Sequence, residues 1–294
     1  MSYKVFINGE FVEEKNAKFF IDDVGFLFGY GIFETMRSFK GYIYRLEDHV
    51  ERLLDSASFF NIPFSLSKEE ICKQVYKTLN LNLLKDAYIK MILSGGLYSG
   101  KLGSPLKGRS LFIIRVLPLE SFSDRVYTEG VKATFSSIRR SPFSPVVKHK
   151  TLNFMENLFA RKEAESKGFQ EAIFLNTEGN LCEGSITNLF IVKKKKVITP
   201  SLSSGILPGI TRKAVIEICA RLSLVCEEKS VKPEELFKAD EAFLTNSLRG
   251  ILPLIEVDFK KIGEGKPGEV TQLLMKEYET VSYTHLTLPT TPYV

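Results

Sequence analysis

The spacing of apolar residues predicts an amphipathic helix early in the chain. Leu46, Val50, Leu53 and Ala57 recur at intervals of three or four residues, which places them on one face of a helix over 47–60. The positions between them are mostly polar or charged. The helix is therefore expected to bury one side and expose the other.

A second helix is predicted downstream by a pair of polar residues. Ser67 and Glu70 have the spacing of a capping box, in which each side chain binds the backbone N–H of the other. Ile71, Val75 and Leu79 then recur at helical spacing. Around the two helices, strands are expected over 3–8, 10–12, 32–38, 87–93 and 111–117.

Glycines mark irregular backbone between these elements. Asn8-Gly9 is typical of a tight hairpin turn. Gly25, Gly29 and Gly31 lie in an aromatic-rich stretch, which favours a loop whose backbone passes close to another group. A Gly-rich turn that leads into a core strand explains the same residues equally well.

The second half of the chain alternates between strand and helix patterns. Strands are expected over 131–136, 171–175, 185–192, 197–200 and 241–245, and helices over 153–168, 210–222, 233–238 and 270–279. The sequence thus predicts an α/β protein of two domains, 1–118 and 131–280, joined by a connector over 119–130. Residues 281–294 abandon the helical pattern for Thr and Pro and are expected to be non-native or disordered.

Composition and charge narrow the class of protein. The chain has 294 residues, 44% of them hydrophobic and 26% charged, which is ordinary for a water-soluble globular protein. The net charge of +5 is spread out, and its one dense run, Lys193–Lys196, is typical of a solvated hairpin turn. Without an aromatic or Arg stripe beside that run, nucleic-acid binding is not expected.

Neither a metal site nor a membrane segment is expected. The four cysteines have no CxxC pair and no His at metal-binding spacing, which is typical of small buried residues in a reducing compartment. The first residues predict a strand rather than a signal peptide, and no apolar run approaches the ~20 residues of a membrane span. A cytoplasmic protein is therefore expected.

Three features between 148 and 212 suggest a chemical site. Lys150 stands just ahead of a helical pattern, and Glu183 lies among apolar strand residues, where a carboxylate needs a cationic or hydrogen-bonding partner. Ile210 and Thr211 begin a helix, whose first N–H groups suit an anion. Each feature has an ordinary alternative: a surface lysine, a satisfied core carboxylate, and a helix start that binds only water.

Together with other motifs, these features resemble the class IV family of pyridoxal phosphate enzymes. The motifs are GFLFGYGIFETMR, HVERLLDSA, KTLN, EGSITNLFIV, GILPGITR and DEAFLTNS, and they occur in the family's order over nearly the whole chain. The family includes branched-chain aminotransferases, D-amino-acid aminotransferases and aminodeoxychorismate lyase. The resemblance implies fold type IV, with a smaller N-terminal α/β domain, a larger barrel-like cofactor-binding domain at 131–280, and assembly as a homodimer.

The resemblance also implies how pyridoxal 5′-phosphate is bound. Lys150 matches the Schiff-base lysine, whereas Lys148 is out of register. Glu183 matches the carboxylate that pairs with the pyridine nitrogen, so that the ring can accept electrons. The residues that match the phosphate cradle are Arg52, Ile210, Thr211 and Ser247. Lys150 would also be the general base that removes the substrate α-proton.

Substrate contacts are expected from Phe33, Thr35, Lys90, Lys101 and Asn246, and several positions favour the lyase. Phe154 stands where branched-chain aminotransferases usually carry a Tyr, and Lys90 replaces an Arg of those enzymes. The segments IFETMR and TNSLRGILP resemble aminodeoxychorismate lyase, and 95–103 lacks the Arg-x-His pattern of D-amino-acid aminotransferases.

Two alternatives to the lyase stay open. In GGLYSGKLG, where lyases commonly carry an Arg, the chain offers only Lys101, which binds a carboxylate as a point charge. The first alternative is an aminotransferase acting on branched-chain L-amino acids or D-amino acids. The second is an inactive relative that serves as a scaffold, against which stands the joint retention of Lys150, Glu183 and Arg52.

Overall fold

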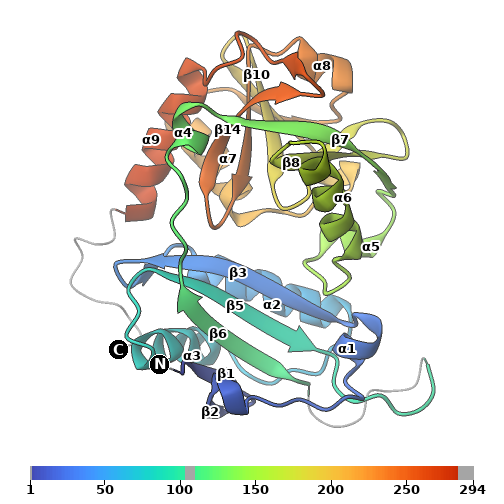
Figure 1. Cartoon of the computed structure of the whole chain (residues 1–294), viewed down its shortest axis with the longest axis vertical. Coiled ribbons are helices and arrows are strands. Elements are labelled where there is room, and N and C mark those ends of the chain that lie inside the picture. Colours follow the sequence, from blue (N-terminus) through green and yellow to red (C-terminus); the bar gives the residue numbers. More distant parts are fainter. Residues whose placement is uncertain (1, 103–109, 284–294) are drawn as a thin grey trace. The chain divides into compact units, whose positions relative to one another are not determined.

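The computed structural model describes residues 2–102 and 110–283, which form two compact units. The first unit comprises the described residues up to Glu120, the segment Lys150–Asn153 and Tyr283. The second comprises Ser121–His149 and Phe154–Ser282. Each unit contains its own sheet and its own helices, so the predicted α/β class is confirmed (Figure 1).

The first unit is built on a six-stranded antiparallel sheet in the order β2-β1-β6-β5-β3-β4. Its strands are β1 (Lys4–Ile7), β2 (Glu10–Glu13), β3 (Gly31–Phe39), β4 (Tyr42–Ile43), β5 (Ala87–Ser94) and β6 (Phe112–Pro118). Its helices are the 3₁₀ helix η1 (Glu14–Asn16), α1 (Val24–Phe28), α2 (Leu46–Phe59) and α3 (Lys68–Leu81).

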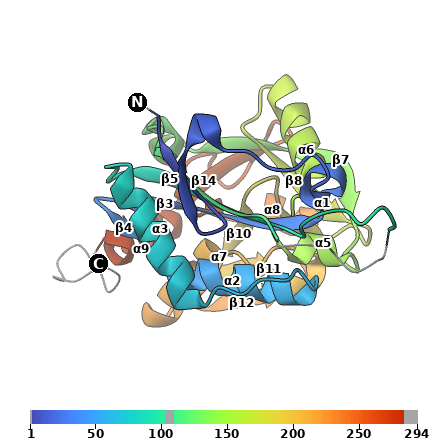
Figure 2. The same cartoon turned by 90° about the horizontal axis from the view of Figure 1, so that it is seen from below.

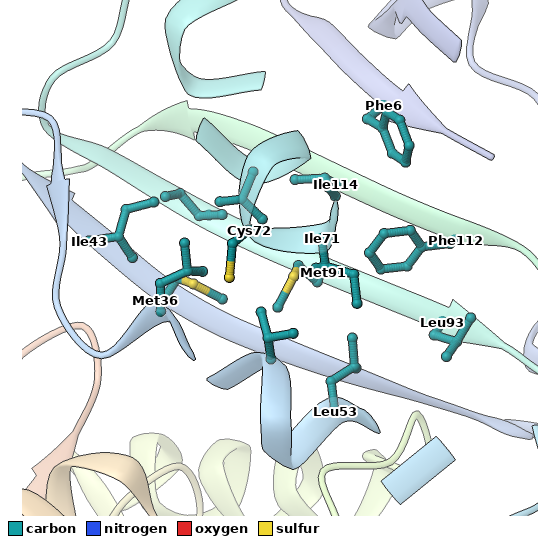
Figure 3. Packing of buried hydrophobic residues seen from close by; sticks show 14 of the residues in the cluster. Phe6, Met36, Ile43, Leu53, Ile71, Cys72, Met91, Leu93, Phe112 and Ile114 are labelled. Carbon is teal, nitrogen blue, oxygen red and sulfur yellow. The ribbon is translucent and has the colours of Figure 1, made fainter. Parts of the chain in front are cut away.

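The core of this unit lies between the sheet and α2 and α3. Alternate residues of β3 and β5, among them Met36 and Met91, point into it and meet Leu53 of α2 and Ile71 of α3 (Figure 3). The two helices lie on the same side of the sheet (Figure 2). The amphipathic stripes of the sequence therefore mark the faces that are buried.

The predicted capping box begins α3. The Ser67 hydroxyl accepts a hydrogen bond from the Glu70 N–H at 3.2 Å, and the Glu70 carboxylate accepts one from the Ser67 N–H at 2.7 Å. Both helices predicted in this unit are thus confirmed, with ends that differ by only a few residues.

The second unit is built on a nine-stranded sheet that closes on itself. Along β12-β11-β10-β13-β14-β7-β8-β9, the last strand pairs with β10 as well as β8. This ring confirms the barrel-like architecture. The strands are β7 (Val131–Arg140), β8 (Glu171–Asn176), β9 (Leu181–Gly184), β10 (Asn188–Lys193), β11 (Lys196–Pro200), β12 (Cys226–Lys229), β13 (Glu241–Asn246), β14 (Gly250–Val257) and β15 (Lys260–Lys261).

Helices pack on the outside of this ring. Ala160 and Ala164 of α6 bury their methyl groups beside Phe174 of β8. The helices are α4 (Arg125–Thr128), α5 (Pro145–Lys148), α6 (Met155–Ser166), the 3₁₀ helix η2 (Leu202–Ser204), α7 (Ile210–Arg221), α8 (Pro233–Phe237) and α9 (Glu269–Tyr283). Across the described ranges, no helix is long and apolar enough to cross a membrane.

Several elements differ from the sequence predictions. The stretch expected to be a glycine loop contains the short helix α1, because Asp23 caps its first turn and Gly29 ends it with a φ of 68°. The region after Asn246 contains the unpredicted strand β14. Helix α9 continues through 281–283, which the sequence assigned to the tail. The remainder of that tail, 284–294, and residues 103–109 between β5 and β6 lie outside the described residues.

Candidate active site

The segment that carries Lys150 lies along β3 as an additional short strand. The Phe33 N–H donates to the Lys150 carbonyl at 2.8 Å, and the Leu152 N–H donates to the Gly31 carbonyl at 2.8 Å. Between these bonds, Ile32 and Thr151 form a β-bridge. This pairing explains why the segment Lys150–Asn153 belongs to the first unit although the residues before and after the segment belong to the second.

Four of the predicted site residues lie on one face of the first sheet. The Lys150 Nζ lies 4.7 Å from the centre of the Phe33 ring, and the Lys90 Nζ lies 4.7 Å from the same ring. Thr35 follows Phe33 by two positions on β3, so it shares this face, and it pairs directly with Lys90 on β5. The structure therefore brings Phe33, Thr35, Lys90 and Lys150 together.

Lys90 is partly shielded from solvent on this face. It is half-buried, and within the part of the chain that the structure describes no carboxylate forms an ion pair with it. Burial, assisted by the Arg115 charge, lowers the pKa of Lys90. Lys101 is instead exposed in the loop after β5, and Lys148 is exposed at the end of α5.

Arg52 is held by a carboxylate on the opposite face of β3. The Glu34 carboxylate accepts hydrogen bonds from Arg52 Nε and Nη2, both at 2.7 Å. It also accepts one from His49 Nδ1 at 2.7 Å. Glu34 and His49 are each only 1% exposed. Because a carboxylate can only accept, the proton of His49 lies on Nδ1.

The pKa values of both Glu34 and His49 are lowered in this cluster. Burial alone would raise the pKa of Glu34, but Arg52 and the His49 hydrogen bond outweigh it and lower that pKa to about 2. Burial lowers the pKa of His49, and its contacts with Glu34 only partly oppose this. At neutral pH the cluster is therefore an ionised Glu34–Arg52 pair with a neutral histidine beside it.

Acid should destabilise the chain through Glu34. The pKa of Glu34 is lowered on folding, so its ionised form stabilises the folded state. This contribution is complete above pH 4.5 and is lost as the pH falls towards about 2. A shift of this size corresponds to about 3 kcal/mol. In chemical unfolding measured from pH 7 to pH 2, Glu34→Gln should be less stable than the unaltered protein at pH 7, with the two curves converging at low pH. A constant difference across this range would contradict the assignment.

In the second unit, Glu183 is surrounded by donors. Its carboxylate accepts from Arg140 Nη1 at 2.5 Å, from Asn188 Nδ2 at 3.0 Å and from the Leu207 N–H at 3.1 Å. Arg140, at the end of β7, is itself buried and stacks on the Phe174 ring at 3.9 Å. The partner that a carboxylate in this strand was predicted to need is therefore present.

The same network reaches the start of α7. Asn188 also donates to the Leu207 carbonyl at 2.9 Å, three residues before the helix begins at Ile210. The helix is preceded by Gly209, where an added Cβ would lie 1.9 Å from the Asn188 Oδ1, and this N-cap glycine makes no side-chain hydrogen bond to the first N–H groups. These groups are suited to bind an anion.

Three further predicted residues, Thr211, Asn246 and Ser247, also belong to the second unit. Thr211 is buried, and its hydroxyl lies 3.5 Å from that of Tyr278 on α9. Asn246 uses its Oδ1 to accept the N–H groups of Leu248 and Arg249, at 3.1 and 2.8 Å, and so shapes the turn between β13 and β14. Ser247 occupies that turn and is half-buried.

Four residues of these networks were not identified from the sequence: Glu34, His49, Arg140 and Asn188. A signal existed for two of them. Glu34 is a carboxylate within an apolar strand, and His49 precedes Arg52 by one helical turn, so both share one face of α2. Arg140 and Asn188 carried no local signal, because only the pairing of β7, β8, β9 and β10 brings them to Glu183.

Comparison with known proteins identifies the family. Residues 31–257 match the model of the amino-transferase class IV family, and the chain therefore belongs to that family. Enzymes of this family use pyridoxal 5′-phosphate. The expected resemblance and cofactor are thereby confirmed.

The similar proteins include both activities that the sequence suggested. A putative branched-chain-amino-acid aminotransferase of Methanocaldococcus jannaschii is 35% identical, with 95% of this chain and 96% of the relative covered. The aminodeoxychorismate lyase of Bacillus subtilis is 32% identical, with 94% and 93% covered. The crystal structure of the Escherichia coli branched-chain amino acid aminotransferase superposes with a TM-score of 0.91 at 29% identity, with 96% and 95% covered.

The residues of the chain fit pyridoxal 5′-phosphate. Lys150 provides an amine, Glu183 a carboxylate held by an ion pair with Arg140, and α7 a start whose N-cap residue is a glycine. When bound, this cofactor supplies a conjugated ring that accepts electrons from a substrate carbanion. Among the described residues, no group of three or more His, Cys, Asp or Glu side chains could hold a metal ion.

Proposed function

We propose that this enzyme is an aminodeoxychorismate lyase, which converts 4-amino-4-deoxychorismate to 4-aminobenzoate and pyruvate for folate synthesis. The observation that carries the proposal is the turn between β13 and β14. Its sequence, TNSLRG, resembles that of lyases, and Asn246 builds it by binding the N–H groups of Leu248 and Arg249. Branched-chain aminotransferases usually carry a small Gly-Thr-Ala turn here.

The proposed roles follow from the chemistry of each side chain. Lys150 binds the cofactor and then acts as the general base that removes the α-proton. Glu183 holds a proton at the pyridine nitrogen, and Arg52, the backbone of Ile210 and Thr211, and the Ser247 hydroxyl bind the phosphate. The reaction is an elimination in which the enolpyruvyl group of the substrate leaves as pyruvate. The substrate's own six-membered ring becomes aromatic, and no keto acid is consumed.

The substrate side is assigned to Phe33, Thr35, Lys90, Lys101 and Asn246. Lys90 suits a substrate carboxylate, because it is half-buried and forms no ion pair with the described carboxylates. Lys101 is exposed and would bind a second carboxylate only as a point charge. The Oδ1 of Asn246 is engaged in its own turn, so its Nδ2 is the group available to donate to a substrate.

A second candidate is an aminotransferase for branched-chain L-amino acids or D-amino acids. The similarity to the Methanocaldococcus jannaschii protein and to the Escherichia coli structure favours it. Phe154 opposes the branched-chain activity, because it offers no hydroxyl to the cofactor's phenolic oxygen at the position where those enzymes usually carry a Tyr. The two activities differ in whether an acceptor keto acid is needed.

A product assay should separate the two candidates. Pure protein loaded with pyridoxal 5′-phosphate is expected to release equal amounts of 4-aminobenzoate and pyruvate from 4-amino-4-deoxychorismate without 2-oxoglutarate. Branched-chain L-amino acids and D-alanine, each supplied with 2-oxoglutarate, should give little glutamate. The Lys150→Ala protein is the blank for both assays.

Rapid glutamate formation without 4-aminobenzoate would assign the aminotransferase instead. Absence of both products from a cofactor-loaded protein would favour the scaffold alternative.

We further propose that the enzyme acts as a homodimer in the cytoplasm. An exposed apolar cluster of the first unit supports the dimer: Phe19, Phe20, Ile21 and Phe26 are 55%, 72%, 73% and 62% exposed. All four cysteines are free thiols, which suits a reducing compartment.

A further inference from the structure

The buried carboxylate of Glu34 fixes one edge of the Arg52 guanidinium. Two parallel hydrogen bonds of 2.7 Å, from Nε and Nη2, occupy both carboxylate oxygens. Such a fork sets the direction of the whole guanidinium plane. Glu34 itself has little freedom to move, because it lies on β3 directly opposite Met91 of β5 and is 1% exposed.

We propose that Glu34 is a positioning residue, which holds the Arg52 guanidinium in the orientation that binds the phosphate of the cofactor, and that His49 secures Glu34 in that task. The inference rests on the phosphate-binding role proposed for Arg52. It extends the site to two residues that contact Arg52 or its partner rather than the cofactor. Neither residue would act on the substrate.

Preorganisation is the physical reason for such a pair. A free arginine side chain loses conformational freedom when it binds a phosphate, and this loss weakens binding. In this chain the two bonds to Glu34 fix the side chain in advance. Both bonds use the edge of the guanidinium that carries Nε and Nη2, so the orientation of the whole group is set by Glu34.

His49 suits its part because it is neutral and lies on the same helix as Arg52. Its Nδ1 donates to Glu34 Oε2, the oxygen that also accepts from Arg52 Nη2. The groups that act on His49 are Glu34, Arg52 and Lys150, and burial keeps the ring uncharged near pH 7. It therefore adds a third hydrogen bond without competing with Arg52 for the negative charge.

The strand of Glu34 also supports Lys150. Phe33, the residue before Glu34, donates its N–H to the Lys150 carbonyl, and Ile32 forms a bridge with Thr151. A single strand thus anchors both the phosphate-binding arginine and the backbone of the cofactor-binding lysine.

The test compares pyridoxal 5′-phosphate with pyridoxal, which lacks the phosphate. Both are titrated into cofactor-free protein, and binding is followed by visible absorbance. Glu34→Gln replaces one acceptor oxygen with an N–H donor that opposes the donors of Arg52 and His49. We expect it to weaken pyridoxal 5′-phosphate binding about three- to tenfold and to leave pyridoxal binding unchanged.

Two further variants calibrate the result. Arg52→Ala should weaken pyridoxal 5′-phosphate alone, by about ten- to a hundredfold, because a charge-assisted phosphate contact is lost. Glu70→Gln is the matched control. It makes the same change of side chain in the α3 capping box of the same unit, where no role in phosphate binding is proposed. Because the Gln amide oxygen can still accept the Ser67 N–H, this variant should fold normally and leave the ratio of the two affinities unchanged.

Each outcome either supports or overturns the inference, and the deciding quantity is the ratio of the affinity for pyridoxal 5′-phosphate to the affinity for pyridoxal. An equal loss of both ligands in Glu34→Gln would make Glu34 a structural residue and overturn the inference. An unchanged ratio in Glu34→Gln beside a lowered ratio in Arg52→Ala would overturn it while leaving the role of Arg52 intact. An unchanged ratio in Arg52→Ala would remove that role, and the inference with it. If Glu34→Gln does not fold, two His49 variants replace it. His49→Ala should lower the ratio, and His49→Asn, which keeps an N–H donor, should restore it. Equal ratios in these two variants would contradict the role of His49.

Discussion

Replacement of Lys150 by Ala should abolish activity and leave the fold intact. The variant loses the amine that we propose binds the cofactor and acts as the general base, and a general base alone contributes about 10²–10⁴-fold. The fold should survive because the contacts that hold this segment on β3 are made by the backbone of Lys150, Thr151 and Leu152. Activity, the visible absorbance of bound cofactor and the melting temperature measure these effects.

Lys148→Ala is the matched control. Lys148 is exposed at the end of α5, two positions before Lys150, and should be dispensable for both absorbance and activity. Loss of the visible band in Lys148→Ala, with its retention in Lys150→Ala, would exchange the two assignments. An unfolded Lys150→Ala protein would show that the side chain is needed for structure.

Removal of the Glu183 carboxylate should affect both stability and activity. In Glu183→Ala, the buried Arg140 loses its counter-charge, and breaking a buried ion pair costs about 3–5 kcal/mol. Asn188 and the Leu207 N–H lose an acceptor as well. Glu183→Gln retains the size and one acceptor oxygen, so it should fold, but it cannot hold a proton at the pyridine nitrogen. We expect its activity to fall by about 10²-fold or more.

Glu171→Gln separates these two effects. Glu171 is another buried carboxylate of the same sheet, and it accepts hydrogen bonds from the Ala172 and Ser185 N–H groups and from the Thr187 hydroxyl. Its replacement should lower the melting temperature and preserve most of the activity well below that temperature. If Glu171→Gln and Glu183→Gln lose activity equally, the loss reflects the sheet and not a role at the ring nitrogen.

Elements with a local signal were predicted well. The stripe on α2 and the capping box of α3 depend on residues within four positions of one another, so their period and spacing report the structure directly. The hairpin at Lys194 and Lys195 is a similar case, with φ angles of 49° and 62° at the tip of β10 and β11. In each case the interactions that form the element are encoded within the element.

Elements that depend on distant partners were not predicted. Strand β14 contains Pro253, which argues against a central strand, yet it pairs with β13 on one side and with β7 on the other. The β7 pairing begins only at Leu254, after the proline. Helix α1 has five residues and most of its apolar side chains exposed, so it lacks the periodic pattern by which a helix is recognised.

The sequence by itself determined the class of fold and the family, because motifs and periodicity lie along the chain. Only the tertiary structure decided which groups those residues meet. Lys150 joins β3 through backbone pairing, Glu183 meets Arg140 across the closed sheet, and Arg52 meets Glu34 between α2 and β3. The physical reason is that side-chain periodicity reports which face is buried, whereas the identity of the partner depends on contacts between residues far apart in the chain.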